Sequence, residues 1–261
     1  MNADDRRHRL NAVLLEPDPT DALWELCSSG DADIVVPELG ALELEQDPIH
    51  RHKDVLAHTI AVTAKTRPDL TLRLAALFHD IGKPATRSFD HGGVTFRHHE
   101  AVGAKITKRR MRDLGYESEV VKDVAELVRL SGRFKGYGDG WTDSAVRCYT
   151  RDAGHLFGLL NELVRADCTT RNRAKEARLH EQIDDLERRV VRLAREAQEA
   201  AERPQLDGKA VMELLGLPAG REVGEALAFL LELKRTEGEL ADDEIEARLR
   251  SWWEQRTGAG S

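Results

Sequence analysis

The sequence is short of several features that would place a protein in a special class. Aromatic residues make up 5% of the 261 residues, and the three cysteines (Cys27, Cys148 and Cys168) are scattered and odd in number. This cysteine usage is typical of a reducing compartment, so we expect a cytoplasmic protein. The chain has no apolar run of ~18 residues and no continuous apolar segment near its start. We therefore expect neither a membrane-spanning helix nor a signal peptide.

The charge balance also lacks an excess of basic residues. Lysine and arginine number 39 against 47 aspartates and glutamates, which gives a net charge of −8. Such a balance argues against broad nonspecific nucleic-acid binding, but it leaves room for a local basic patch. Hydrophobic residues make up 41% and charged residues 33% of the chain. This composition indicates a helix-rich protein with long charged faces.

Helical periodicity fills the stretches between the glycines and prolines, so we expect an all-α fold. Apolar residues at helical spacing predict helices at about residues 53–65, 70–81, 99–114, 118–130 and from about 155. Thr142 is placed to cap another helix, and Pro84 is expected to stop the one at 70–81. Residues 86–96 are expected to form a loop that turns at Gly92 and Gly93. Two or three tail helices are expected after Pro204.

Three predicted helices carry a metal-capable polar side chain on an otherwise apolar face. These side chains are His58, the tandem pair His79 and Asp80, and Asp167. A buried carboxylate or imidazole is costly unless it is paired or coordinates a metal. A single histidine of this kind is most often a hydrogen-bonded core residue, and Asp167 could pair with a nearby arginine. Three such positions together favour a metal site.

The chemistry that fits these residue types is a site with two imidazole and two carboxylate ligands. Such donors suit a divalent ion such as Mn, Fe, Co, Ni or Zn, and the nitrogen donors make Mg less favoured. Four protein ligands on an octahedral ion leave two positions for water and substrate, and a metal-activated water is a nucleophile near neutral pH. Lys83 closely follows the tandem pair, and a cation there fits a phosphate substrate. We expect Gly82 to free the turn that brings Lys83 to the phosphate.

The same residues resemble a known family. His58, then His79 and Asp80 with the letters IGK following, then Asp167, resembles the HD superfamily of metal-dependent phosphohydrolases. The stretches RLAALFHDIGKPATR, FRHHEAVGAKI and RADCTTRN further resemble the C-terminal body of bacterial tRNA nucleotidyltransferases, the CCA-adding enzymes and their poly(A) polymerase relatives. The resemblance implies an HD-domain helical bundle with an additional C-terminal helical arm and tail.

The resemblance also divides the chain into three segments. We expect a helical linker segment at residues 1–48, an HD metal-binding domain at 49–171, and the arm and tail at 172–261. The tRNA nucleotidyltransferases begin with a head that has a glycine-serine turn and paired aspartates for magnesium. Residues 1–48 contain no such motif. We therefore expect the body without the polymerase, and we do not predict CCA addition.

Two positions depart from the relatives and bear on the number of metal ions. The relatives usually have histidines where Ser131 and Lys135 stand in this sequence. Serine is a poor metal ligand, and a lysine would repel a second cation. We therefore expect one divalent ion per chain, which also argues against the dinuclear iron oxygenases of the superfamily.

The resemblance implies a phosphohydrolase in which a metal-activated water attacks phosphorus. Lys83 and Arg87 are candidates to steady the phosphate, and Arg171 is a further substrate-binding candidate. His98 or His99 could protonate the leaving oxygen; the alternative is that both are exposed loop or N-cap residues. The expected substrate is nucleotide-like: a nucleoside monophosphate, a phosphorylated nucleoside intermediate or a 2′,3′-cyclic phosphate.

Two other functions stay open. An RNA-binding module is suggested by a basic stripe of Lys105, Lys108, Arg109 and Arg112, and by a second basic run at residues 165–178. Solvated helix faces balanced by nearby acids explain the same residues. Assembly is suggested by apolar residues at steps of three and four over residues 179–197, which predict a long amphipathic helix or a short coiled-coil arm. Packing within the chain is the more common use of such a stripe.

Overall fold

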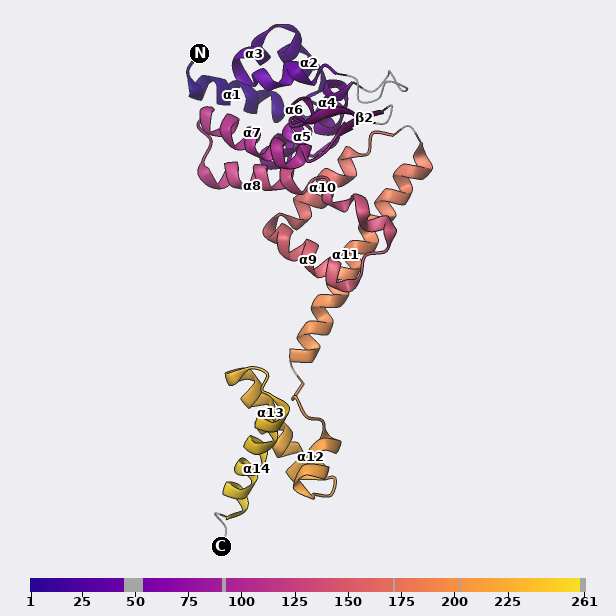
Figure 1. Cartoon of the computed structure of the whole chain (residues 1–261). Helices are drawn as coiled ribbons and strands as arrows, with labels where there is room; N and C mark the ends of the chain where they lie inside the picture. The colour runs from indigo at the N-terminus through magenta and orange to yellow at the C-terminus, as the bar shows by residue number, and fades with distance from the viewer. Residues whose placement is uncertain (45–53, 91–92, 171, 202, 259–261) are drawn as a thin grey trace. The chain divides into compact units, whose positions relative to one another are not determined.

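Helices make up nearly all of the structure, a computed structural model that describes residues 1–44, 54–90, 93–170, 172–201 and 203–258 (Figure 1). The expected all-α fold is confirmed, with one short hairpin in addition. Within these ranges, no helix is long and apolar enough to cross a membrane.

The elements up to residue 113 are α1 (Ala3–Leu14), α2 (Thr20–Ser28), α3 (Asp31–Val35), the 3-10 helix η1 (Pro37–Leu42), α4 (Val55–Lys65), α5 (Leu70–Phe78), α6 (Lys83–Thr86), β1 (Arg87–Asp90), β2 (Gly93–Phe96) and α7 (His99–Asp113). The elements that follow are α8 (Ser118–Leu130), η2 (Arg133–Asp139), α9 (Asp143–Ala153), η3 (Gly154–Leu156), α10 (Phe157–Asp167), α11 (Arg173–Ala201), α12 (Gly208–Leu215), α13 (Arg221–Glu237) and α14 (Asp242–Gly258).

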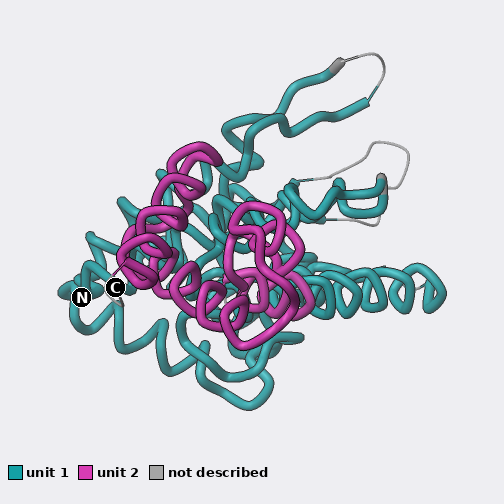
Figure 2. The backbone as a smooth tube through the Cα atoms, turned by 90° about the horizontal axis from the view of Figure 1, so that it is seen from below, with its two compact units in different colours: residues 1–190 teal, residues 191–261 magenta. Residues whose placement is uncertain are grey.

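The chain forms two compact units, residues 1–190 and 191–261 (Figure 2). The division falls within α11. The segment boundaries predicted at residues 48 and 171 both lie outside the described residues. The first unit holds every described residue that the sequence nominates for a site, so its core decides how those residues are placed.

Helix α5 lies at the centre of the first unit. Every residue from Leu72 to Phe78 is buried, and α5 contacts α1, α4, α7, α8 and α10. Its start is fixed by Asp69, whose Oδ1 accepts a hydrogen bond from the Leu72 N–H at 3.0 Å. The helix ends at Phe78, three residues before the predicted end, although Ile81 is buried as expected. The central helix therefore delivers the next two residues, His79 and Asp80, into the interior.

The segment after α5 differs from the prediction in two ways. Pro84 does not simply stop α5; it lies in the first turn of α6, where its missing N–H costs nothing. Residues 87–96 are not a plain loop, because β1 and β2 pair antiparallel with Arg87 opposite Phe96. Four-residue strands give too short an alternation to be read from sequence. Part of the predicted turn at Gly92 and Gly93 lies outside the described residues.

The first part of α11 packs onto the first unit. Ile183 and Leu186 are fully buried. The amide of Asn161 in α10 donates a hydrogen bond to Glu187 at 3.0 Å, and a guanidinium nitrogen of Arg189 lies 2.7 Å from Asp143 in α9. This half of the amphipathic stripe is therefore used within the chain.

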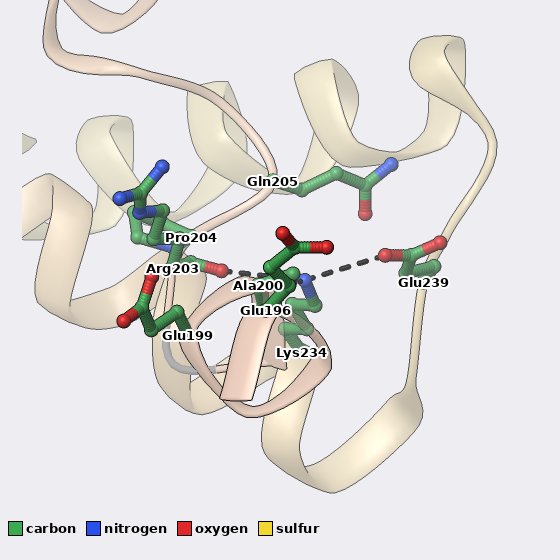
Figure 3. A pocket seen from close by; sticks show the side chains of 8 residues that line it. All are labelled: Glu196, Glu199, Ala200, Arg203, Pro204, Gln205, Lys234 and Glu239. Carbon is green, nitrogen blue, oxygen red and sulfur yellow. Dashed lines mark hydrogen bonds and ion pairs between the residues drawn. The ribbon is translucent and has the colours of Figure 1, made fainter. Parts of the chain in front are cut away.

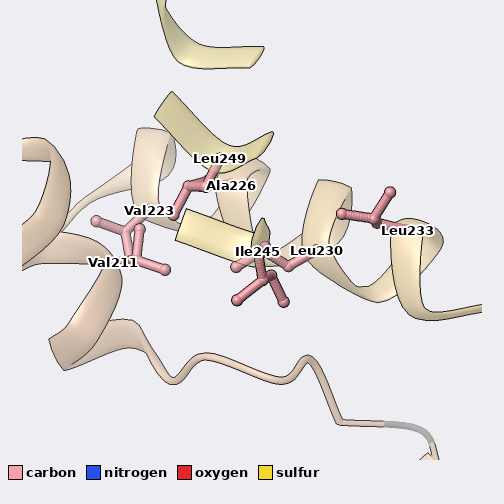
Figure 4. Packing of buried hydrophobic residues seen from close by; sticks show 7 residues of the cluster. All are labelled: Val211, Val223, Ala226, Leu230, Leu233, Ile245 and Leu249. Atoms are coloured by element: carbon pink, nitrogen blue, oxygen red, sulfur yellow. The ribbon is translucent and has the colours of Figure 1, made fainter. Parts of the chain in front are cut away.

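The second unit holds the end of α11 and the tail helices α12, α13 and α14, with a small core of its own. Val211, Val223, Ala226, Leu230, Leu233, Ile245 and Leu249 form its buried cluster (Figure 4). The end of α11 joins this unit through Lys234, whose Nζ donates to the carbonyl oxygens of Ala200 (2.9 Å) and Arg203 (3.3 Å) (Figure 3). Lys234 thus ties α13 to the end of α11 and to the segment that follows it.

Candidate metal centre

The four predicted metal ligands come together from three helices. His58 lies in α4, His79 and Asp80 follow the end of α5, and Asp167 is the last residue of α10. Nε2 of His58 lies 2.9 Å from Oδ1 of Asp167 and 3.3 Å from Nε2 of His79. Oδ2 of Asp80 lies 3.2 Å from Nε2 of His79 and 3.6 Å from Nε2 of His58. The three helices therefore bring these side chains close together, with Nε2 of His58 within 3.6 Å of a nitrogen or oxygen of each of the other three.

Hydrogen bonds on the far side of each imidazole fix which nitrogen faces this point. Nδ1 of His79 lies 2.7 Å from the carbonyl oxygen of Ala76. A carbonyl only accepts, so Nδ1 carries the proton and the lone pair of the neutral ring lies on Nε2. Nδ1 of His58 lies 2.9 Å from Oγ1 of Thr169, which holds that ring in the same sense. Both rings are thus oriented to offer Nε2 as a ligand.

The spacing of the donor atoms fits one divalent ion. Two ligands bonded at ~2.1 Å lie ~3.0 Å apart at a right angle and ~3.4 Å apart at the tetrahedral angle. The distances that join the two imidazoles to each other and to the two carboxylates run from 2.9 to 3.6 Å. Three of them, His58, His79 and Asp167, each offer one atom within 4.8 Å of the others. Two imidazoles with carboxylates form a donor set for a transition metal or zinc.

Charge holds the cluster together against the cost of burial. Burial by itself disfavours the charged form of His79, but the Asp80 and Asp167 carboxylates outweigh it and raise the pKa of His79 to about 10. Burial also opposes the charged form of Asp80, yet the charge and hydrogen bond of His79 hold its pKa well below the usual range. A divalent cation bound here would displace a proton from this cluster, so its affinity would depend on pH.

Lys83 is part of the cluster. Its Nζ donates to Oδ2 of Asp80 at 2.6 Å, and its side chain is 12% exposed. The ammonium group thus lies on the same carboxylate oxygen that faces the two imidazoles. This places a cation beside the donor atoms, where the sequence predicted it.

The part of the chain that carries the cluster also identifies its family. A family model described as the HD domain matches residues 55–194, more than half of the chain, and this span contains His58, His79, Asp80 and Asp167. The chain belongs to the HD domain family. Members of this family bind metal, in agreement with the donor set described above.

Curated relatives of this HD domain chain are tRNA nucleotidyltransferases. The A-adding tRNA nucleotidyltransferase of Deinococcus radiodurans is 34% identical over 262 residues, and the alignment covers 97% of this chain and 59% of the relative. The CC-adding tRNA nucleotidyltransferase of Thermus thermophilus is 33% identical over 263 residues, covering 95% of this chain and 56% of the relative. The chain thus spans less than two thirds of the length of these relatives. The predicted resemblance to both groups is confirmed.

Glycine is required at position 82 of the HD segment for a different reason from the one predicted. Its φ of −83° and ψ of −11° are ordinary helical values that any residue adopts, so the turn does not depend on glycine. The reason is space: a Cβ on Gly82 would lie 2.1 Å from the carbonyl oxygen of His99 and 2.6 Å from the amide nitrogen of Gly103. Glycine here lets α7 pack directly against the HD turn.

The two histidines at the start of α7 differ in position. His98 is exposed and forms the N-cap in the left-handed region, with φ at 61°. His99 is buried; its Nε2 lies 3.4 Å from Oδ1 of Asp80, and its Nδ1 lies 2.8 Å from the carbonyl oxygen of Phe96. The next residue, Glu100, pairs with Lys135, whose Nζ lies 3.6 Å from Oε1 of Glu100. Of the two candidates, the geometry places His99 at the cluster.

The remaining predicted site residues have other surroundings. Arg87 is exposed at the start of β1, with its guanidinium 5.0 Å from the ring centre of Phe89. Ser131 is buried, and its hydroxyl donates to the carbonyl oxygen of Val128 at 3.0 Å. Arg171 lies outside the described residues. The ring contact of Arg87 thus lies within the hairpin and not at the cluster.

Sequence reasoning does not find Thr169 or Glu100. Thr169 follows α10 in a segment with no periodicity, and its value lies in a hydrogen bond to a residue 111 positions earlier. Glu100 looks like an ordinary acid in the first turn of a helix. The one usable signal for Thr169 is its nearness to Asp167, because side chains around a metal ligand commonly orient the neighbouring ligands.

Proposed function

We propose that this protein is a metal-dependent phosphohydrolase that acts on a nucleotide-like phosphate. The observation that supports this most is the convergence of two imidazole nitrogens and two carboxylates with an ammonium group beside them, Nζ of Lys83 being 2.6 Å from Asp80. Ligands for a divalent ion and a separate fixed cation together suit a phosphate group, which carries charge on several oxygens.

His58, His79, Asp80 and Asp167 would hold one divalent ion, with Mn, Fe, Co, Ni or Zn favoured over Mg because of the nitrogen donors. The bound ion supplies a water of lowered pKa and withdraws charge from the phosphoryl group. Asp167 is the most open of the four, with its side chain 34% exposed against 3% for Asp80. Substrate therefore approaches from the side of Asp167 and His58.

Lys83 is the residue best placed to steady the phosphate. Its ammonium is fixed by Asp80 and by the ring of Phe96, whose centre lies 5.6 Å away. A phosphate oxygen that enters beside the ion can share the ammonium with Asp80, since an ammonium donates up to three hydrogen bonds. Arg87 and Arg171 are the further cations we assign to substrate binding.

His99 is the residue we assign to proton transfer. Its Nδ1 is held by the carbonyl of Phe96, and its Nε2 faces Asp80. A histidine fixed in this way can give a proton to the leaving oxygen, a step typically worth ~10²–10⁴-fold in rate. His98 is exposed at the N-cap, and we assign it a smaller part.

The substrate class rests on the relatives. The A-adding and CC-adding enzymes have tRNA in their names, so their ligands include nucleotides. We propose a nucleoside monophosphate, a phosphorylated nucleoside intermediate or a 2′,3′-cyclic phosphate as the substrate. A cytoplasmic location is part of the same proposal.

Metal analysis combined with a substrate panel tests this function. The purified protein is loaded with Mn, Co, Ni or Mg, its metal content is measured, and phosphate release is followed on the three substrate classes. Asp167→Asn should lose metal and activity together, whereas Asp184→Asn, at an exposed position of α11, should keep both. No hydrolysis on the whole panel by protein that carries stoichiometric metal would contradict the proposal.

A second candidate, RNA binding, is favoured by one observation. Lys105, Lys108 and Arg112 are all exposed along α7, whereas Arg109 beside them lies 3.5 Å from Glu38. A phosphate-based interface weakens steeply with salt. Binding of tRNA that falls with rising salt, and that drops when these three residues are replaced by alanine, supports this candidate. Binding that salt does not affect removes it.

A further inference from the structure

The β1–β2 hairpin presents two different faces. Because side chains alternate along a strand, Arg87 and Phe89 share one face with their partners Phe96 and Val94. The opposite face is closed by a hydrogen bond of 2.8 Å between the hydroxyls of Ser88 and Thr95. A hairpin of two short strands is weak on its own, so this polar bond helps to hold the register. The face that carries Arg87, Phe89 and Phe96 is therefore the one available to contact a ligand.

This face is continuous with the metal centre. The ring centre of Phe96 lies 5.6 Å from Nζ of Lys83, and that Nζ binds Asp80 at 2.6 Å. The carbonyl oxygen of Phe96 also holds His99. A phosphate beside Lys83 would thus lie next to Phe96, with the rest of the substrate free to extend along the hairpin.

Phe89 is the unusual residue on this face. Its side chain is 72% exposed, more than any other large apolar side chain among the described residues. The guanidinium of Arg87 lies 5.0 Å from its ring centre and holds it by a cation–π contact. An aromatic ring that is fixed at one side and open to solvent elsewhere is suited to stack on a flat ligand.

We propose that this hairpin face binds the nucleobase of the substrate, with Phe89 stacked on the base and Arg87 holding the ring. This inference rests on the proposed function and adds to it the part of the site that selects a nucleotide over a simple sugar phosphate. Stacking accepts any base, because every base has a π face. Phe89 is therefore a residue for class recognition and does not select one base.

The test uses the full chain and a ligand that reports stacking directly. Fluorescence of 1,N6-etheno-AMP is quenched when its base stacks on an aromatic ring, and its binding to the metal-loaded protein is followed by rapid mixing, before hydrolysis proceeds. Phe89→Ala should abolish most of the quenching and weaken binding roughly 5- to 100-fold. Phe89→Trp should retain both. Ile34→Ala, at an exposed apolar position of α3, is the matched control and should bind like the wild type.

A second measurement separates this inference from the proposed function. The ratio of kcat/KM for AMP to kcat/KM for ribose 5-phosphate should fall by a similar factor in Phe89→Ala, because the two ligands share the phosphate and differ in the base. Quenching that depends on Phe89 without any phosphate release would support the hairpin site while it contradicts the hydrolase. Hydrolysis of AMP with the same ratio and the same quenching in both proteins would overturn the hairpin site and leave the hydrolase standing.

Discussion

Oγ1 of Thr169 lies 2.9 Å from Nδ1 of His58, although 111 positions separate the two residues in the chain. The hydroxyl oxygen accepts a hydrogen bond from Nδ1–H of His58 when Nε2 of that ring serves as a ligand. We predict that Thr169→Val weakens metal binding about 10- to 100-fold, because valine keeps the shape but cannot fix the ring. Calorimetric titration with Mn or Zn measures the affinity.

The conservative variant Thr169→Ser retains the hydroxyl and should bind metal nearly as well as the wild type. The visible absorption of bound Co should also change in the valine variant, since the ring of His58 is no longer held. Equal affinity in Thr169→Val and Thr169→Ser would show that the hydroxyl has no part in the centre.

The candidate metal ligands stand out in the sequence because they break a local pattern. His79 and Asp80 directly follow an apolar helix, and a polar pair at such a place is conspicuous. Helices with strong periodicity could also be predicted from the sequence. Helix α8 runs from Ser118 to Leu130, as the spacing predicts, and α11 starts one residue after the expected position.

What the sequence conceals depends on packing between distant segments. Ile81 extends the apolar pattern of α5, yet it is buried by the fold after the helix has ended. The hairpin is too short to show an alternation. The need for glycine at position 82 arises from the backbone of α7, which only the folded chain brings close.

Gly82 should not tolerate a side chain. A Cβ there would lie 2.1 Å from the carbonyl oxygen of His99 and 2.6 Å from the amide of Gly103, both of which are backbone atoms that cannot rotate away. We predict that Gly82→Ala moves α7 away from the HD turn, lowers the melting temperature and weakens metal binding. Thermal unfolding and metal titration of the same preparation measure both effects.

Gly158→Ala is the matched control for this variant. Gly158 lies in α10, and a Cβ there would meet nothing within 4 Å. Alanine favours helix over glycine by up to ~1 kcal/mol, so this variant should be as stable as the wild type or more so. The same loss in both variants would refute the steric argument.

Arg73 should be a major contributor to stability. It is 1% exposed in the middle of α5, and its guanidinium donates to backbone carbonyls that follow the ends of two other helices. Its acceptors include Pro17 at 3.2 Å, beyond the end of α1, and Thr66 at 3.1 Å, at the end of α4. We predict that Arg73→Met lowers the free energy of unfolding by about 3–5 kcal/mol, because several buried carbonyls lose their donors. Urea unfolding followed by circular dichroism measures this.

The stability of Arg73→Lys should fall between that of the wild type and that of Arg73→Met, since an ammonium cannot reach several carbonyls in the fork geometry of a guanidinium. The control is Arg147→Met at an exposed position of α9, which should change stability by less than ~0.5 kcal/mol. A similar small change in Arg73→Met would mean that the carbonyls find other donors.

Glu38 and Arg110 should make stability depend on pH in the acid range. Nε of Arg110 donates to Oε2 of Glu38 at 2.8 Å, and the two side chains are 13% and 16% exposed. Burial by itself would raise the pKa of Glu38, but the hydrogen bonds and charge of Arg110 hold it below the usual value. A carboxyl with a lowered pKa in the folded state stabilises the protein above its unfolded pKa of about 4.5. This contribution is lost as the pH falls through the lower, folded pKa.

Glu38→Gln should therefore lower the free energy of unfolding at pH 7 by about 1–3 kcal/mol, and the gap to the wild type should close as the pH falls below about 4. Urea unfolding at pH 7, 5, 4 and 3 measures the gap. Glu119→Gln is the control, because Glu119 and its partner Lys122 are 81% and 71% exposed, and such pairs contribute little. A gap between Glu38→Gln and the wild type that stays constant with pH would show that shape, and not charge, makes Glu38 stabilising. A gap that closes identifies the ion pair as the link that fastens η1 to α7, and so to the helix that packs on the HD turn.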